Sequence, residues 1–278
     1  ILNNTQRKIA IIGGGPMGLS VAYELTKNGY KPEIIEADDR LGGMAASFEF
    51  ANQRIERYYH FHCTGDFAYK NLLKELGLEK QLNWKKTKMG FFFNGKLYEW
   101  GSVFSVLKFP AISFFSRLRY LLHALRCLTI NDWKHLDKIK ATKWLKKWLG
   151  KKSYRILWEK LFEYKFFNYS DDISAAWIWS RIKRLGKSRH LLKETLGYIN
   201  GGSEKFIQAI ETRIRHSGGI IHLNSKVKSI TPRKKGGGTI DFGKGEIFYD
   251  EIISTIPLPL ITKFLRTVES RKIFIYLI

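Results

Sequence analysis

Apolar and polar positions in the first 36 residues follow the pattern of a strand, a helix and a second strand. Ile9–Ile12 is an unbroken apolar run, as expected for a strand buried on both faces of a parallel sheet. A glycine-rich break follows, and apolar residues then recur at helical spacing at Leu19, Ala22, Tyr23 and Leu25. A second apolar strand is expected at Glu33–Ile35. This order predicts the β-α-β unit of an α/β fold.

The break between the first strand and the helix has the spacing of a dinucleotide-binding turn. Gly13, Gly15 and Gly18 form the pattern G-x-G-x-x-G, in the strand-turn-helix context that this fingerprint requires. Gly13 permits a tight turn, Gly15 lets the backbone approach a pyrophosphate, and Gly18 lets the helix pack closely on the strand. Glu36 ends the second strand roughly 20 residues later, where an acid accepts hydrogen bonds from ribose hydroxyls. The alternative is a glycine-rich turn without a ligand.

A second glycine motif follows the acid within one short loop. Arg40 is followed by Gly42 and Gly43, so a guanidinium and two flexible backbone N–H groups are available for a second pyrophosphate contact. Together, the two glycine motifs and Glu36 resemble the FAD-binding signature of the flavin amine oxidase, protoporphyrinogen oxidase and phytoene desaturase superfamily. The resemblance covers residues 8–60 and 196–260 well and the middle of the chain only in general character.

Three later segments extend the resemblance. Gly197–Gly202, before a helix from Ser203, resembles the family's return to the FAD-binding domain. Ser225–Val227 resembles a strand whose backbone touches the adenine side, and Ser254–Pro257 a strand that closes the sheet. The resemblance implies FAD as the cofactor, bound by these residues: Gly13, Gly15, Pro16, Met17, Gly18, Glu36, Ala37, Arg40, Gly42, Gly43, Met44, Val227 and Thr255.

Catalytic residues are not indicated by the sequence, and His60 and His62 are the candidates. Many members of the superfamily carry Asp-x-Gly-x-His near the flavin, whereas this chain keeps His60 but has Glu56-Arg57-Tyr58 before it. His60 and His62 would lie on one face of an extended strand, where they could orient substrate or donate to the flavin. The alternative is two structural or surface histidines. No metal site is expected, because no third ligand stands at suitable spacing.

The resemblance implies a Rossmann-like FAD-binding domain that is split in sequence by an inserted, mostly helical substrate domain. We expect FAD-binding parts at residues 1–85 and 196–257, the substrate (cap) domain at 86–195, and the start of a truncated substrate-domain segment at 258–278. Asn94-Gly95, between two aromatic strands, predicts a hairpin at the beginning of the insert.

Charge and cysteine content limit the partners and the compartment. The formal net charge is +23, which favours an anionic partner, although lysine-rich codon usage would produce the same excess. Two cysteines without metal-ligand spacing suit a reducing compartment. No apolar run reaches the ~18 residues of a transmembrane helix, and no signal peptide is recognised. We therefore expect a cytoplasmic protein, with a small-molecule substrate and an anionic membrane surface as candidate partners.

Residues 141–149 are the strongest membrane candidate. On a helix, Trp144, Leu145 and Trp148 would share one face, and Lys143 and Lys146 the other, as in helices that lie at a bilayer surface. The alternative is a surface helix that buries its tryptophans in its own domain. Nucleic acid is a weaker interpretation, because no recognised binding module accompanies the basic and aromatic residues.

We conclude from the sequence that the chain is an FAD-dependent, amine oxidase-like oxidoreductase. Hydride would pass from a C–N or C–C bond of an anionic or lipid-linked substrate to flavin N5. The alternatives are a non-redox flavoenzyme resembling UDP-galactopyranose mutase and an inactive fragment of a longer flavoprotein. Only 21 residues follow Pro257, and Ile273–Ile278 is an apolar run without a visible partner, so we expect this chain alone to lack activity. Electron acceptor and oligomeric state are not indicated.

Overall fold

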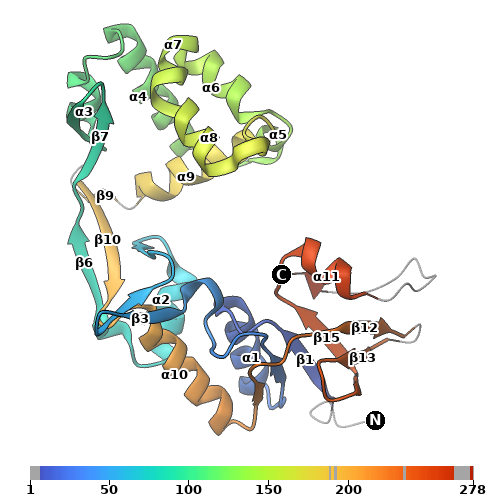
Figure 1. The fold of residues 1–278 in the computed structure, drawn as a ribbon. Helices are drawn as coiled ribbons and strands as arrows, with labels where there is room; N and C mark the ends of the chain where they lie inside the picture. The colour runs from blue at the N-terminus through green and yellow to red at the C-terminus, as the bar shows by residue number, and fades with distance from the viewer. Residues whose placement is uncertain (1–6, 188, 191–192, 234–235, 266–275, 278) are drawn as a thin grey trace. The chain divides into compact units, whose positions relative to one another are not determined.

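The computed structural model describes residues 7–187, 189–190, 193–233, 236–265 and 276–277. The chain forms two compact units, each built from separate stretches of sequence (Figure 1). Unit 1 contains residues 1–60, 71–82 and 199–278, and unit 2 contains residues 61–70 and 83–198. Residues 61–70, which the sequence placed with the first FAD-binding part, thus belong to unit 2, and residues 258–278 belong to unit 1.

Unit 1 is organised around a parallel sheet with the strand order β11-β2-β1-β15-β16. Its strands are β1 (Ile9–Ile12), β2 (Glu33–Ile35), β11 (Ile220–His222), β15 (Glu251–Ser254) and β16 (Tyr276–Leu277). In the centre of the sheet, Ile11 is in register with Ile34 on one side and with Ile253 on the other. The described part of the C-terminal apolar run therefore has a partner, because Tyr276 pairs with Ile253.

The two faces of this sheet are covered differently. Ala10, Ile12 and Ile35 pack in one apolar core with residues of the antiparallel strands β12 (Ser229–Pro232), β13 (Gly238–Asp241) and β14 (Glu246–Tyr249). Since side chains alternate along a strand, Ile11 and Ile34 point to the opposite face. That face is covered by two helices that contact each other, α1 (Pro16–Lys27) and α10 (Ser203–His216). Helix α11 (Leu258–Phe264) joins the first core through Ile261.

Two connecting segments of unit 1 show how local residues shape its turns. The hairpin of β3 (Ser47–Phe50) and β4 (Gln53–Glu56) turns at Ala51 and Asn52, which both have positive φ, as two-residue hairpins require. Ser225–Val227, expected as a strand, is not one. The backbone N–H of Ser225 instead donates to the Glu36 carbonyl (2.8 Å), and Lys228 donates to Asp241, so no ladder forms here.

Unit 2 contains the predicted hairpin, which is followed along the chain by a series of helices. Strands β7 (Met89–Phe93) and β8 (Lys96–Trp100) pair across Asn94-Gly95, where both residues have positive φ. The helices that follow are α3 (Val103–Lys108), α4 (Phe114–Thr129), α5 (Lys134–Asp137), α6 (Ala141–Leu149), α7 (Lys151–Tyr154), α8 (Lys160–Phe166) and α9 (Ala175–Lys187). A small sheet contains β5 (His62–Cys63), β10 (Lys193–Ile199) and β6 (Leu82–Lys86), with β9 (Arg189–His190) on β10. Helix α2 (Phe67–Glu75) runs across the boundary of the two units.

The amphipathic helix at residues 141–149 is buried on its apolar face. Trp144, Leu145 and Leu149 are at most 7% exposed and belong to the main core of unit 2, together with residues of α9. Lys143 and Lys146 lie exposed on the opposite face. Of the two interpretations of this helix, the structure supports burial of the tryptophan face within its own domain. None of the helices in the described part of the chain is long and apolar enough to cross a membrane.

Candidate functional site

The glycine turn between β1 and α1 is shaped by close backbone contacts. Gly13 has φ +104° and donates its N–H to the Ile35 carbonyl (3.0 Å). A Cβ on Gly18 would lie 1.9 Å from the Gly13 carbonyl oxygen, so no other residue fits there. A Cβ on Gly15, in contrast, would meet nothing within 4 Å. The first and third glycines of the motif are thus required by the fold, and the second faces open space.

The beginning of α1 faces this open space without a cap. Gly15 is the N-cap residue, no side chain of the described residues accepts a hydrogen bond from the first turn, and the turn contains no acid. Pro16 occupies the first helical position, where its missing N–H costs nothing. The remaining N–H groups of the first turn have no partners within the helix, and the helix dipole makes this end electropositive. The arrangement suits an anionic group such as a pyrophosphate.

The second glycine motif packs directly on the first. The Gly42 N–H donates to the Gly14 carbonyl (2.8 Å), and a Cβ on Gly43 would lie 3.3 Å from Gly15 Cα. Gly42 has φ +108°, and a Cβ there would also meet Ile207 of α10 at 2.4 Å. The two motifs, more than 20 residues apart in sequence, therefore form one glycine-lined surface within unit 1.

Glu36 holds this surface together at the end of β2. Its Oε2 accepts the Gly14 N–H (2.6 Å), and its Oε1 accepts the Asp38 N–H (2.9 Å). Each carboxylate oxygen has a further lone pair, so the group can still accept a hydrogen bond from a ribose hydroxyl. Glu36 is therefore both a structural acceptor for the turn and a candidate acceptor for a ligand.

Two arginines lie in the loops around the glycines. Arg40 forms a two-point pair with Asp39, which lowers the pKa of that carboxyl, and it also donates to the Ser47 carbonyl (2.9 Å). The guanidinium of Arg57 is 2.7 Å from an Asp38 carboxylate oxygen and donates to the Gly43 carbonyl at 3.5 Å. Arg57 was not among the predicted cofactor residues, and no local pattern in the sequence marks it.

The remaining predicted cofactor residues fall in different environments. Met17 and Met44 are exposed, at 45% and 67%, and Ala37 is also exposed. Thr255 closes the turn, since its hydroxyl donates to the carbonyls of Ile12 (3.0 Å) and Gly13 (3.3 Å). Val227 is buried in the core beneath the sheet, which leaves only its backbone for a ligand.

The two candidate histidines do not share a strand, contrary to expectation. The strand at this point contains only His62 and Cys63, and His60 lies in the preceding loop. His60 Nδ1 is 3.8 Å from a Glu56 carboxylate oxygen and has no hydrogen-bond partner among the described residues. His62 stacks on Tyr69 with ring centroids 4.1 Å apart. His60 belongs to unit 1 and His62 to unit 2.

Two structural residues of the site were missed in the sequence. Glu56 accepts the Ser203 N–H at 2.6 Å and so caps α10, which begins after Gly202 without a cap of its own. Gly14 is tightly enclosed, because a Cβ there would lie 2.5 Å from Leu41 Cδ2 and 3.2 Å from Glu36 Cβ. The run of three glycines could have indicated the role of Gly14. The role of Glu56 could not be read from a local pattern, because its contact with Ser203 joins residues 147 positions apart.

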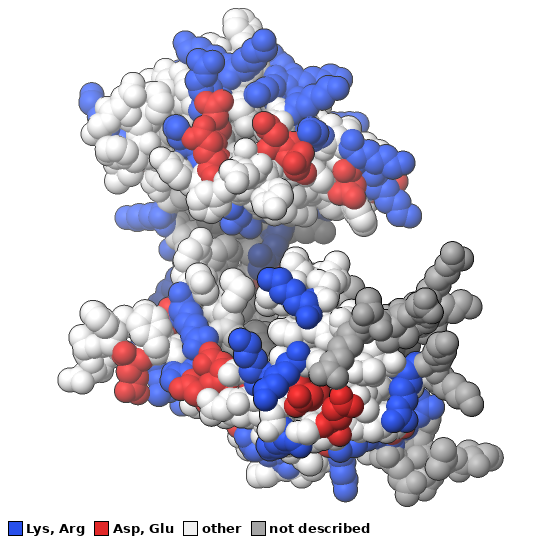
Figure 2. All heavy atoms as spheres, turned by 45° about the vertical axis from the view of Figure 1, so that its right-hand side comes forward, with Lys and Arg blue, Asp and Glu red and all other residues white. Residues whose placement is uncertain are grey.

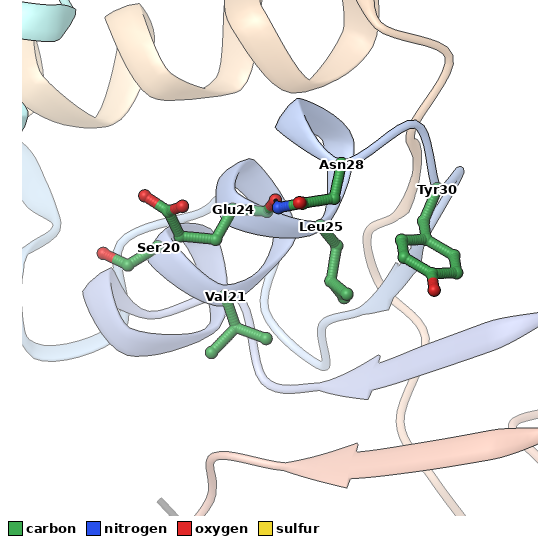
Figure 3. A pocket seen from close by; sticks show the side chains of 6 residues that line it. All are labelled: Ser20, Val21, Glu24, Leu25, Asn28 and Tyr30. Carbon is green, nitrogen blue, oxygen red and sulfur yellow. Dashed lines mark hydrogen bonds between the residues drawn. The ribbon is translucent and has the colours of Figure 1, made fainter. Parts of the chain in front are cut away.

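The described residues fit FAD. An open space lies before Gly15, the helix start is uncapped, a carboxylate with free acceptor capacity stands at the end of β2, and Gly43 borders the space. No group of three or more side chains suited to a metal ion occurs in the described ranges. The single cavity drawn in Figure 3, about 400 Å³, lies along α1 instead, where Val21, Leu25 and Tyr30 point to one side. None of the predicted cofactor residues lines it.

Comparison with known proteins gives the same family as the motifs. The sequence profile of the family described as flavin containing amine oxidoreductase matches residues 18–272. The chain is 28% identical over 252 residues to the 15-cis-phytoene desaturase of Arabidopsis thaliana, covering 80% of this chain and 42% of that protein.

Two solved structures show the same fold. The putrescine oxidase bound to putrescine superposes with a TM-score of 0.66 at 20% identity, over 93% of this chain and 60% of that one. The reduced UDP-galactopyranose mutase superposes with a TM-score of 0.68 at 19% identity, over 94% and 58%. The chain thus spans about two fifths of the length of the curated relatives that it matches.

Proposed function

Since the chain belongs to the flavin-containing amine oxidoreductase family, we propose that it holds FAD through the two glycine motifs, as part of an oxidoreductase that converts a C–C bond of its substrate to C=C, with a hydride removed from one carbon and a proton from the next. Membership in this family implies that FAD is the cofactor and that the enzyme class is oxidoreductase. When it is bound, FAD supplies the hydride acceptor of the reaction, while the protein supplies binding, orientation and electrostatics.

The open space before Gly15 is the observation that supports this assignment most directly. A pyrophosphate there would accept hydrogen bonds from the backbone N–H groups in the first turn of α1, and it would lie beside Gly43. Glu36 would accept the ribose hydroxyls, and Arg57, fixed by Asp38, would add positive charge beside the second glycine motif. His60, whose Nδ1 has no partner among the described residues, is the candidate donor to the bound ligand.

A C–C bond of an apolar, lipid-like substrate is the preferred target. The Arabidopsis thaliana relative that matches 80% of this chain is a 15-cis-phytoene desaturase. A dicationic amine such as putrescine is disfavoured electrostatically by a chain of net charge +23. A sugar-nucleotide substrate, as in UDP-galactopyranose mutase, is the alternative, supported by the same charge and by the shared fold.

Paired glycine substitutions test the cofactor site. Gly15→Ala adds a methyl group to the space assigned to the pyrophosphate, whereas Gly65→Ala adds the same group at another position where it meets nothing within 4 Å. We expect Gly15→Ala to lower FAD affinity at least tenfold in a fluorescence titration, and to leave the unfolding temperature of the apoprotein unchanged. Gly65→Ala should change neither. Equal FAD affinity of Gly15→Ala and the wild type would refute the site.

The reaction is tested on the full-length protein by anaerobic mixing with polyprenyl hydrocarbons, diamines and UDP-sugars. Bleaching of the oxidised flavin by the hydrocarbon alone is the expected result. Bleaching by the diamine would replace the C–C assignment with a C–N one. Conversion of a UDP-sugar only after the flavin has been reduced would favour the mutase alternative.

A further inference from the structure

Helix α4 of unit 2 presents its apolar side to solvent. Six of its nine exposed residues are large and apolar, and at a helical turn of 100° these six fall within one arc of about 140°. They are Phe114 (57%), Phe115 (77%), Leu118 (38%), Leu122 (57%), Leu125 (58%) and Leu128 (38%). The opposite side is the buried one, with His123 and Cys127 at 1% or less. Single exposed leucines are common on proteins, but six such residues on one helix face form a patch that marks an interaction surface.

The chemistry around this face is cationic and free of acids. Arg119 and Arg126 lie exposed along one flank of the arc, and Arg119 also donates to the Lys147 carbonyl at the end of α6. From Trp100 to Asn131 the sequence contains no Asp or Glu. The neighbouring helix α3 adds Phe104, which is 65% exposed.

The whole of unit 2 shares this charge. Its residue ranges contain 26 Lys and Arg against 9 Asp and Glu, a net +17, whereas the ranges of unit 1 contain 22 against 16, a net +6. Figure 2 shows Lys and Arg crowded over one edge of unit 2. The positive charge of the protein is therefore concentrated on the unit that exposes the apolar helix face.

We propose that the exposed face of α4 docks on an anionic lipid bilayer, with Phe and Leu side chains in the acyl-chain boundary and Arg119 and Arg126 at the headgroups. The helix has 16 residues and is about 24 Å long, shorter than the roughly 30 Å hydrocarbon core, so it lies in the surface and does not span it. A helix ridge is convex, and a fluid bilayer adapts to it without a matching groove. Cations beside the ridge add attraction to anionic headgroups.

This surface is distinct from residues 141–149, where the sequence pattern first suggested membrane contact. There the tryptophan face is buried, and only lysines face outward. In α4 the opposite holds, since the face with the phenylalanines and leucines is exposed to solvent and the face with His123 and Cys127 is buried. The inference does not depend on the flavin chemistry proposed above.

An environment-sensitive fluorophore at position 122 tests the docking without a disruptive substitution. In the full-length protein, Leu122→Cys is labelled and mixed with vesicles of phosphatidylcholine, or of phosphatidylcholine and phosphatidylglycerol in equal parts. Native Cys63 and Cys127 are both buried, and labelling of the unsubstituted full-length protein is the baseline from which the signal of the introduced thiol is measured. Leu161→Cys, on α8 and 47% exposed, is the matched control.

We expect a blue shift and protection from an aqueous quencher at position 122 with the anionic vesicles, and neither at position 161. Leu122→Glu with Leu125→Glu should lower the vesicle partition coefficient at least tenfold, while Leu161→Glu leaves it unchanged. Arg119→Glu with Arg126→Glu should lower binding to anionic vesicles only. An unchanged far-ultraviolet circular dichroism spectrum and an unchanged unfolding midpoint show that each variant is folded.

Several outcomes would overturn the proposal. The absence of a shift at position 122, or an equal shift at position 161, would exclude this face as the lipid contact. A thiol at position 122 that does not react before vesicles are added would show that another part of the full-length protein covers α4. A dimer that the paired glutamates convert to a monomer would assign the face to a second copy of the chain.

Discussion

Units 1 and 2 differ in what forms their most notable surfaces, which is the backbone in unit 1 and side chains in unit 2. In unit 1 the candidate cofactor surface is mostly backbone, because glycines and an uncapped helix start form it beside one carboxylate. In unit 2 the notable surface is made of side chains, with apolar residues exposed on α4 and a large excess of positive charge in the same unit. A backbone site needs fixed residues at fixed spacing and can therefore be recognised in a sequence. An amphipathic helix has a polar and an apolar side, but its sequence does not say which side faces the core.

The two units also bury polar groups differently. In unit 1, Glu33 accepts hydrogen bonds from Tyr249 (2.9 Å) and pairs with His222 (2.9 Å). Burial alone would raise the pKa of Glu33, but these hydrogen bonds and nearby Lys8 lower it below its usual range. In unit 2, His123 is buried beside Cys127 (3.9 Å) with no charged partner among the described residues, and burial lowers its pKa to about 4. Unit 1 thus keeps a charge that is satisfied, whereas unit 2 keeps a histidine that is neutral.

The largest effect is expected from the buried side of α6. Leu145→Ala removes a fully buried side chain from the core of unit 2 and should cost about 2–5 kcal/mol of unfolding free energy. Lys143→Ala, on the exposed side of the same helix, should change it by less than about 0.5 kcal/mol. Chemical denaturation of both variants measures the difference. Similar small losses would mean that α6 does not pack as described.

Acid should affect the two units at different pH values. His123 has a folded pKa of about 4, below its ordinary 6.5, so the unfolded chain binds a proton first. Stability from this group is complete above pH 6.5 and is lost as the pH falls toward 4, by at most about 3 kcal/mol. Glu33, also with a lowered pKa, loses its contribution only below its ordinary pKa of 4.5.

His123→Gln separates these two titrations. The variant should show a flatter dependence of unfolding free energy on pH between 6.5 and 4.5, while Tyr249→Phe should leave that range unchanged and lessen the loss below pH 4.5. Urea denaturation at closely spaced pH values measures both slopes. An unaltered slope in His123→Gln would assign the acid sensitivity to other groups.

The smallest effect separates a glycine of the fold from a glycine of the ligand site. Gly18→Ala places a methyl group 1.9 Å from the Gly13 carbonyl, and the forced shift should cost about 1–3 kcal/mol in the apoprotein. Gly15→Ala should cost almost nothing without FAD, because its φ of −72° suits alanine and the space is open. Thermal unfolding of the two apoproteins provides the comparison. Equal destabilisation would contradict the division of roles within the motif.

The sequence by itself determined the elements that depend on local chemistry. The strands at Ile9–Ile12 and Glu33–Ile35, the helix after Gly15 and the hairpin at Asn94-Gly95 all occur where the pattern predicted them. Each depends on a few adjacent residues, such as a glycine with positive φ or an unbroken apolar run. The family also followed from such local motifs, and the sequence profile confirms it.

Only the tertiary structure decided the contacts between distant residues and the direction in which each helix faces. The Glu56 cap on α10, the Arg57–Asp38 pair and the packing of Gly43 against Gly15 join segments that no local pattern connects. The sequence left both interpretations of residues 141–149 open and did not single out α4, because amphipathicity is a property of one helix whereas burial depends on its neighbours. The apolar side of α6 meets α4 and α9 and is buried, while most of the apolar side of α4 stays exposed and only its end at Leu128 lies against Gly186 of α9.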